Sequence, residues 1–435
     1  MKTIYLIIPY LCIQYMNAQH TGLAFATDKK TGCRVVSSGG SDRDSVSWEG
    51  PCKKKLAEGN GILKWYENGS EISRYTGYMH EGLPNGQGLY KYRNGHTAEG
   101  NFLNGELNGQ GIYRMSQDRS LKGNFVNGKF LELDSPYLRR LQKHVVSGQD
   151  STNLYIGDGI NREMFYYILA PEKATAVIVL LPGTWESPEY VLSSNRKLVQ
   201  MAFEEHMAVM VLSLNQRLIL NRDILDFMNL SFNDAIKRYA LPRDKFVIGG
   251  FSMGGMMSLR YTEMAHEDSA KTAIVPRCVY SVDGPADLES LYRNFQKKLD
   301  KNPQAGEPAY GLNEFWKHIG GSPEEFHDRY ITCSPFSRDE KNGGNARFLT
   351  KVPVRIYTDV DPNWWLDYRQ VDMYDLNGLD QSAMILFLLE HGNKEAEFIN
   401  ASGKGYRLEG NRHPHSWSIV DAEDCIRWIK ACMSD

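Results

Sequence analysis

The chain has no excess of charge of one sign, since 50 Lys and Arg residues stand against 53 Asp and Glu residues, for a net charge of −3. Proteins dedicated to nucleic acid usually have a basic excess or a basic stripe, so no nucleic-acid partner is expected. Beyond the N-terminus no apolar run approaches the about 20 residues of a membrane-spanning helix, which excludes a polytopic membrane protein. C-x-x-C, H-E-x-x-H and Walker-type motifs are missing too, so neither a metal nor a cofactor is expected.

Cysteine is scarce, with seven residues in 435. One of them, Cys12, lies within an N-terminal segment of the signal-peptide type, made of Met1-Lys2, a mostly apolar stretch over 3–16 and Asn-Ala-Gln at 17–19. The apolar stretch is too short for a membrane anchor, so a cleaved signal peptide over 1–19 is expected. A leucine precedes Cys12 where a lipoprotein signal would have a small residue, so lipid attachment is not expected. We therefore expect an exported protein, secreted or periplasmic.

The other six cysteines permit disulfides in an exported chain, but the sequence does not choose among the many pairings. Cys425 and Cys432 cannot pair with each other. Seven residues along a predicted helix separate them by about 10.5 Å, which a disulfide cannot bridge.

What the sequence has in abundance is glycine at a fixed spacing. Two sets recur every 23 residues: Gly77, Gly100 and Gly123, and Gly82, Gly105 and Gly128. A period of this kind predicts a stack of one supersecondary unit. Short alternating runs, such as residues 88–92 followed by Asn94-Gly95, indicate that the unit is a β-hairpin. An all-β meander is therefore predicted over 47–131, with too few hairpins to be stable without a neighbour.

The segments 82–90 (GLPNGQGLY) and 105–113 (GELNGQGIY) resemble MORN repeats. The resemblance implies a scaffolding or interaction role for the meander, with a protein or a membrane surface as a possible partner. The net charge of +3 that the sequence gives over 47–131 is too small to argue for anionic lipid.

After about residue 137 apolar strand-like runs alternate with helical segments. Strands are predicted at 176–181, 208–212, 246–249, 273–282 and 352–357, and helices at 190–205, 223–239, 256–265 and 421–432. Continuous apolar runs are typical of parallel strands that are buried on both faces. The fold class is therefore α/β, a doubly wound, mostly parallel sheet preceded by the smaller all-β meander.

The third of these strands leads into Gly250-Phe251-Ser252-Met253-Gly254 and then into a helix. This is the G-x-S-x-G motif in its strand–turn–helix context, which predicts Ser252 as a nucleophile on a strained turn. Gly250 and Gly254 are expected there because a Cβ would collide with the adjoining strand or helix. Met253 follows the nucleophile and is expected to donate one backbone N–H to the oxyanion hole.

A serine nucleophile needs a base, and the base needs an orienting acid. With this motif and these strands the chain resembles the α/β-hydrolase superfamily over about 150–435, in which serine, acid and histidine follow in that order. The family's spacing after the strand 352–357 favours Asp361 as the acid, with Asp359 and Asp283 as alternatives. His415 is preferred over His413 as the base.

The second oxyanion donor is expected after the first core strand, in Pro182-Gly183-Thr184-Trp185. Thr184 and Trp185 are both candidates. Phe251, Trp364 and Trp365 fall near the predicted site and could line a substrate pocket, although packing between loops is an equal interpretation.

A polar segment of almost 70 residues precedes strand 352–357, which suggests a cap over the site. Within it, Ile319-Gly-Gly-Ser-Pro is similar to a stretch of the prolyl-oligopeptidase-type branch of esterases and peptidases. The sequence thus predicts an exported serine hydrolase for small carboxylic esters, with a serine peptidase and a catalytically silent interaction protein as alternatives. The expected parts are the signal peptide (1–19), an N-terminal segment (20–46), the meander (47–131) and the catalytic domain (145–435) with its cap (about 284–350).

Overall fold

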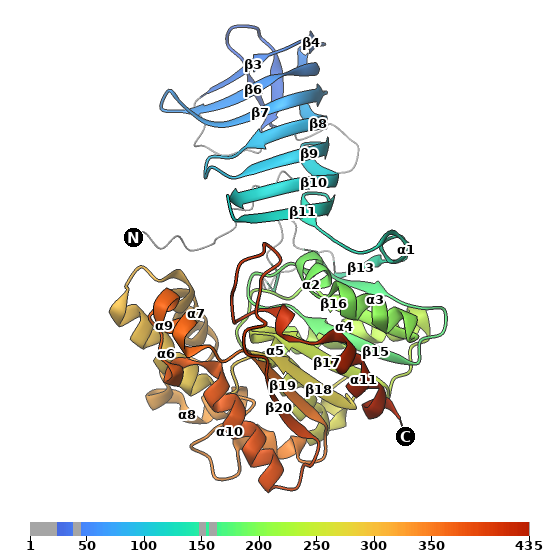
Figure 1. Ribbon diagram of the computed structural model, residues 1–435, viewed down its shortest axis with the longest axis vertical. Coiled ribbons are helices and arrows are strands. Elements are labelled where there is room, and N and C mark those ends of the chain that lie inside the picture. The colour runs from blue at the N-terminus through green and yellow to red at the C-terminus, as the bar shows by residue number, and fades with distance from the viewer. Residues whose placement is uncertain (1–23, 38–44, 148–153, 156–162, 435) are drawn as a thin grey trace.

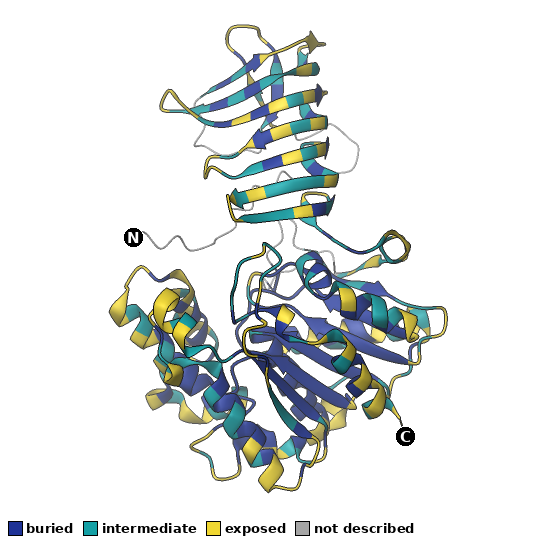
Figure 2. Cartoon of the chain, viewed as in Figure 1, coloured by how far each residue is buried: buried dark blue, intermediate teal, exposed yellow. Residues whose placement is uncertain are grey.

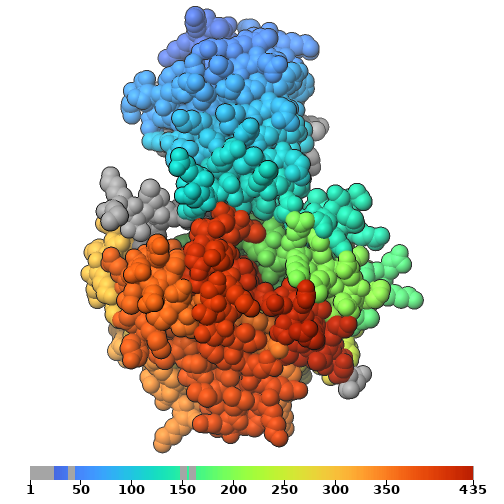
Figure 3. Space-filling view, in the orientation of Figure 1, coloured from blue at the N-terminus to red at the C-terminus, as the bar shows by residue number. Residues whose placement is uncertain are grey.

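The structure is a computed structural model that describes residues 24–37, 45–147, 154–155 and 163–434. The expected signal peptide lies outside these residues. An antiparallel β-meander stands on a larger body in which helices cover a mostly parallel sheet (Figure 1). In the space-filling view the meander forms a separate lobe above this body (Figure 3). Within the described ranges no helix has the length and apolarity needed to cross a membrane.

The meander is an eight-stranded sheet with the order β12-β11-β10-β9-β8-β7-β6-β3, and all its neighbours are antiparallel. The prediction of stacked hairpins is therefore confirmed. Its strands are β3 (Ser45–Glu49), β6 (Gly59–Glu67), β7 (Ser70–His80), β8 (Leu83–Lys91), β9 (Thr97–Leu103), β10 (Glu106–Ser116), β11 (Arg119–Val126) and β12 (Lys129–Phe130).

Two tight turns explain part of the glycine spacing. Asn104 and Gly105 join β9 to β10 with φ values of 54° and 93°, and Asn127 and Gly128 join β11 to β12 with 49° and 74°. A two-residue hairpin turn with positive φ at both positions favours Asn followed by Gly, because these residues tolerate the left-handed region best.

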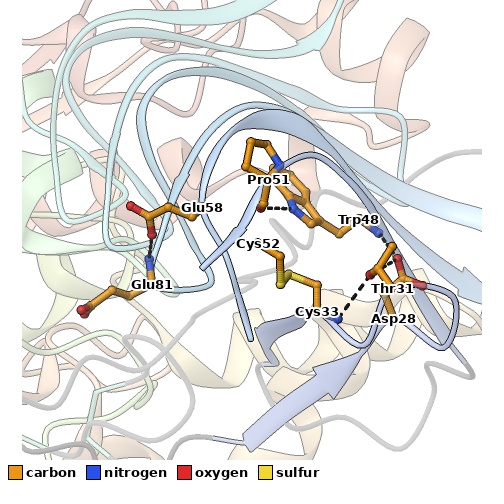
Figure 4. Close-up of a disulfide and its surroundings, with 8 residues drawn as sticks. All are labelled: Asp28, Thr31, Cys33, Trp48, Pro51, Cys52, Glu58 and Glu81. Carbon is orange, nitrogen blue, oxygen red and sulfur yellow. Dashed lines mark hydrogen bonds between the residues drawn. A yellow bond between two sulfur atoms is a disulfide. The ribbon is translucent and has the colours of Figure 1, made fainter. Parts of the chain in front are cut away.

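A small sheet with the order β1-β2-β5-β4 covers the β3–β6 end of the meander. Its strands are β1 (Ala24–Thr27), β2 (Arg34–Ser37), β4 (Cys52–Lys53) and β5 (Leu56–Ala57). A disulfide joins Cys33 to Cys52, and the Trp48 indole donates a hydrogen bond of 2.7 Å to the Pro51 carbonyl beside it (Figure 4). The disulfide therefore ties the first described segment to the start of the meander.

The meander docks on the larger body through the residues that follow β12. Leu131 and Leu133 are buried in the same apolar cluster as residues of two helices, α2 (Pro188–Ser194) and α3 (Arg196–Glu204). The Glu132 N–H donates to Ser193 Oγ at 2.9 Å in the same contact. The expectation that the hairpins pack on a neighbour is met here.

The larger body is built on an eight-stranded sheet with the order β13-β14-β16-β15-β17-β18-β19-β20. β14 is antiparallel to both of its neighbours and every later pair is parallel. The strands are β13 (Gln142–Ser147), β14 (Met164–Leu169), β15 (Ala176–Leu181), β16 (Met207–Leu212), β17 (Phe246–Phe251), β18 (Cys278–Val282), β19 (Val354–Thr358) and β20 (Ala396–Asn400). Every residue of β15, β16 and β17 is buried, as the continuous apolar runs indicated (Figure 2).

Helices cover both faces of this sheet. Apolar residues of α2, α3 and α11 (Ala422–Met433) pack with the sheet in one cluster, and those of α4 (Arg222–Tyr239) and α5 (Met253–Glu267) pack in another. The remaining α-helices are α1 (Ser135–Leu138), α6 (Leu288–Lys301), α7 (Gly306–His318), α8 (Pro323–Cys333), α9 (Pro362–Arg369) and α10 (Asn377–Glu390), and the 3₁₀ helices are η1 (Ser269–Lys271), η2 (Gly344–Leu349), η3 (Met373–Asp375) and η4 (Trp417–Ile419). The doubly wound fold class is confirmed.

Two predicted elements differ in extent. The helix expected over 190–205 is two helices, because the chain leaves the helical conformation at Asn195, whose φ and ψ are −106° and 20°. The strand expected over 273–282 begins only at Cys278. In the second case the apolar run 273–275 ends at Pro276, which cannot donate a hydrogen bond to a neighbouring strand.

Three helices, α6, α7 and α8, lie between β18 and β19 and contact the body beside the loop that follows β15. Arg217 and Glu314 form a buried ion pair of 3.3 Å between the body and α7. The Trp185 and Tyr310 rings are 5.1 Å apart, and the Tyr310 hydroxyl donates to the Gln216 carbonyl. Contacts of both polar and aromatic side chains therefore hold this helical segment, which the sequence predicts to be a cap, to the body.

Replacing Leu131 by alanine tests the docking contact. Leu131 is 2 % exposed, so Leu131→Ala should lower the free energy of unfolding by about 2–5 kcal/mol, the usual loss for a buried leucine. Leu103→Ala in β9 is the matched control, because Leu103 is 46 % exposed and should cost much less. Urea unfolding measures both variants, and equal losses would contradict this account of the contact.

Candidate active site

Ser252 occupies a sharp turn between β17 and α5. Its φ of 55° and ψ of −123° lie outside the regions that side chains prefer, which is the strained geometry expected of a nucleophile elbow. The Ser252 N–H donates to the Val282 carbonyl at 2.9 Å, so the turn is fixed to the end of β18.

The turn is possible only because glycines let backbone segments approach closely. A Cβ on Gly250 would lie 2.1 Å from the Gly254 carbonyl oxygen, and one on Gly254 would lie 2.3 Å from the Leu181 carbonyl oxygen. A Cβ on Gly284 would lie 2.6 Å from the Ser252 carbonyl oxygen. These contacts bring the ends of β15, β17 and β18 together around Ser252.

His415 lies beside this elbow and is oriented by Asp283. The His415 ring is 4.4 Å from the Phe251 ring between centroids, and Phe251 directly precedes Ser252. His415 Nδ1 is 2.5 Å from Asp283 Oδ2. A hydrogen bond donated by Nδ1 leaves Nε2 as the acceptor nitrogen of a neutral imidazole, which is the tautomer that a general base requires.

Asp283 itself is held by several bonds. Its backbone N–H donates to the Tyr357 carbonyl at 2.8 Å, and Asn377 Nδ2 donates to its carbonyl at 2.8 Å. The Thr358 hydroxyl donates to Asp283 Oδ1 at 3.4 Å. The carboxylate therefore has little freedom to turn away from His415.

The expectation that Asp361 orients the histidine is wrong in this geometry. Asp361 caps α9 by accepting the Trp364 N–H at 3.1 Å, and its other oxygen accepts from Arg412 at 2.8 Å. The alternative Asp359 is also engaged elsewhere, since it accepts the Gly405 N–H at 2.8 Å and pairs with Arg412.

The physical reason is the placement of the two strand ends. β18 lies next to β17, whereas β19 lies one strand further from the nucleophile. The Val-Asp-Gly pattern at 282–284 was the available sequence signal, because it places a carboxylate directly after an apolar strand. The sequence gives Asp283 as one of two alternatives to Asp361.

His413, the second candidate for the base, is placed differently from His415. Its Nε2 accepts a hydrogen bond of 3.2 Å from Arg369, and its ring lies 4.8 Å from that of Trp364. Burial, with nearby cations, holds the pKa of His413 far below its usual range, so this imidazole stays neutral. No described carboxylate contacts it in the way that Asp283 contacts His415.

The structure distinguishes between Thr184 and Trp185 as candidates for the second oxyanion donor. The Trp185 N–H donates to the Asn215 carbonyl at 2.9 Å and is therefore already used, which corrects the expectation for Trp185. Thr184 and Met253 line one small cavity of about 10 Å³ together with Asn215. Met253 is the first residue of α5, where backbone N–H groups have no partner within the helix.

The aromatic candidates divide as well. Phe251 is 2 % exposed and its ring contacts those of His415 and Trp417, so it supports the imidazole and does not line a pocket. Of the two interpretations that the sequence left open for Phe251, packing between loops is the one that agrees with the structure. Trp364 and Trp365 are half-buried on α9 and contact the His413 ring. His413 in turn lies beside His415, so these tryptophans are connected to His415 only by way of His413.

Among the described residues, no group of three His, Cys, Asp or Glu side chains is arranged to bind a metal ion. The side chains gathered at this end of the sheet are a serine, a histidine and a carboxylate. This set is suited to nucleophilic attack assisted by proton transfer.

Comparison with protein families agrees with the repeats of the meander. The MORN repeat model matches residues 75–97 and 99–116. No curated protein sequence matches the chain significantly.

The fold is similar to those of solved hydrolases at low identity. A bacterial heroin esterase is 14 % identical with a TM-score of 0.44, covering 68 % of this chain and 84 % of its own. Carboxyl esterase 2 of the fungus Tuber melanosporum is 12 % identical with a TM-score of 0.42, covering 70 % and 86 %. Pyrococcus horikoshii acylaminoacyl peptidase is 14 % identical with a TM-score of 0.45, and the match covers 90 % of this chain and 62 % of the peptidase. From its repeats and its strand order, this chain carries MORN repeats in its N-terminal part, followed by an α/β-hydrolase fold.

Proposed function

We propose that this protein is a serine hydrolase that cleaves small carboxylic esters through an acyl-enzyme on Ser252. The observation that carries the proposal is the hydrogen bond between His415 and Asp283 beside the strained elbow of Ser252. The acid of the proposed triad is therefore Asp283, in place of Asp361.

In the proposed reaction His415 Nε2 takes the proton of the Ser252 hydroxyl as its oxygen attacks the ester carbonyl. The backbone N–H groups of Met253 and Thr184 stabilise the oxyanion of the tetrahedral intermediate. His415 then donates the proton to the leaving alcohol, and Asp283 stabilises the imidazolium throughout. A water molecule activated by His415 hydrolyses the acyl-enzyme and restores the serine.

A peptidase is the second candidate activity, and it is supported by the helical segment between β18 and β19 that resembles the prolyl-oligopeptidase-type branch. The chain departs from those peptidases because a meander takes the place of their β-propeller. The contrasting alternative is a catalytically silent protein that acts through its repeats. The ordered His415–Asp283 pair argues against it, because an unused site has no need of an oriented imidazole.

We also propose that the protein is exported, as the sequence of residues 1–19 predicts. The Cys33–Cys52 disulfide supports this, since disulfides persist mainly in oxidising compartments. The MORN meander is proposed as a scaffold or as a contact surface for a protein or a membrane surface.

Labelling with a fluorophosphonate probe tests the nucleophile and the base. The purified protein should be labelled covalently, whereas Ser252→Ala should not be labelled and His415→Ala should react far more slowly. Circular dichroism of each variant checks that the fold is kept. Labelling that persists in Ser252→Ala would show that another residue reacts, and an unlabelled but folded wild type would count against an active serine.

A pair of asparagine variants tests the choice of acid. Asp283→Asn should lower the labelling rate by about 10⁴-fold, because the imidazole loses the acceptor that fixes its tautomer. Asp361→Asn should cause a much smaller loss, since Asp361 contacts Arg412 and the start of α9. A larger loss in the Asp361 variant than in the Asp283 variant would reverse the assignment.

A further inference from the structure

Glu186 is a buried carboxylate that joins the two loops of the candidate site. It lies in the loop after β15 and accepts the Gly183 N–H at 3.0 Å, next to Thr184. The same oxygen, Oε2, accepts the Trp417 indole N–H at 3.0 Å, two residues beyond His415. One carboxylate oxygen therefore joins the loop after β15 (residues 182–187, the oxyanion loop) to the start of η4, which directly follows the loop that carries His415 (residues 401–416, the histidine loop).

The other oxygen of Glu186 faces a cation. Oε1 is buried without a hydrogen-bond partner and lies 3.6 Å from Arg407 Nη1. The Arg407 guanidinium lies 5.3 Å from the centre of the Phe251 ring, and His415 contacts the same ring. The pair of buried Glu186 and partly exposed Arg407 thus lies beside the aromatic ring that supports the imidazole.

We propose that Glu186 and Arg407 form a positioning pair that holds the oxyanion loop against the histidine loop and sets the local charge beside His415. The inference rests on the proposed hydrolase function. Neither side chain bonds to Ser252 or Asp283, so both act through Gly183, Trp417 and Phe251.

Several charged or titratable groups lie around His415 and Glu186. Their charges decide whether a substitution moves the pH profile of the labelling rate to lower or to higher pH. His415 faces three sets of groups: Asp283, which follows β18, His413, which lies in the same loop as His415, and the Glu186–Arg407 pair. Glu186 also faces Tyr190 of α2.

The hydrogen bonds of Glu186 favour its ionised form. Burial has the largest effect and leaves the pKa of the Glu186 carboxyl above its usual value, although Arg407, the Trp417 indole and the Gly183 N–H oppose that rise. All three partners are donors or cations, and each favours a carboxylate over a carboxylic acid. Removing one member of a buried ion pair leaves the charge of the other uncompensated.

The test is the pH dependence of the rate of fluorophosphonate labelling in Glu186→Gln. Glutamine can accept both hydrogen bonds through its oxygen but carries no charge, so the loops stay in place and Arg407 is left unpaired. The acidic limb of the rate profile should then move to lower pH by about half a unit or more, because a nearby cation opposes protonation of the base. Arg407→Gln should move the limb in the opposite direction.

Glu186→Ala tests whether Glu186 positions the oxyanion loop against the histidine loop. Loss of both hydrogen bonds should lower the labelling rate at the optimum pH by about 10²-fold, as expected when reactive groups shift by about 1 Å. Glu186→Gln should restore most of this rate. Equal rates for the alanine and glutamine variants would overturn the positioning role.

Glu263→Gln is the matched control, because Glu263 is also a buried glutamate and pairs with Arg260 at 2.7 Å on α5. It should leave the acidic limb unchanged. If the wild type reacts but the limb stays fixed in both Glu186→Gln and Arg407→Gln, the inference fails and the proposed function stands. If Glu186→Gln does not fold, the direction of the shift in Arg407→Gln decides alone. A wild type that does not react at all would remove the proposed function itself.

Discussion

The close backbone approach at Ser252 is the constraint on which the rest of the candidate site depends. The serine can adopt its left-handed conformation only because Gly250, Gly254 and Gly284 leave room for neighbouring carbonyl groups. The same approach brings the ends of β15, β17 and β18 together, so the loop after β15, Ser252 and Asp283 lie close to one another. An elbow of this kind is expensive in local strain and needs a rigid sheet beneath it. The fully buried strands on either side supply that rigidity.

Much of the fold could be predicted because its determinants are local in the sequence. The buried strands are continuous apolar runs such as 176–181, and the meander follows from glycines that recur every 23 residues. The Ser252 elbow could be predicted because strand, turn and helix are contiguous. His415 was identified from its position near the end of the chain.

The acid and the second oxyanion donor depend on spatial relations that one sequence does not contain. Asp283 and Asp361 both follow an apolar strand, and only the order of strands in the sheet decides which carboxylate meets His415. In the same way, the Trp185 N–H is unavailable because of a carbonyl at Asn215, on a loop 30 residues later. Glu186 and Arg407 carry no motif at all, since they are 221 residues apart and meet only in the folded chain.

Arg412 pairs with two carboxylates that follow β19, so residues after β18 and after β19 contact different parts of the site. Arg412 binds both Asp359 and Asp361, so the carboxylates after β19 secure the loop that carries His415, while the carboxylate after β18 interacts with the imidazole itself. Residues after one strand thus support the loop of His415, and a residue after another strand contacts its imidazole. Substitutions after β19 can alter how firmly the histidine loop is held without changing the acid that the imidazole contacts. The two properties are therefore free to diverge independently in related sequences.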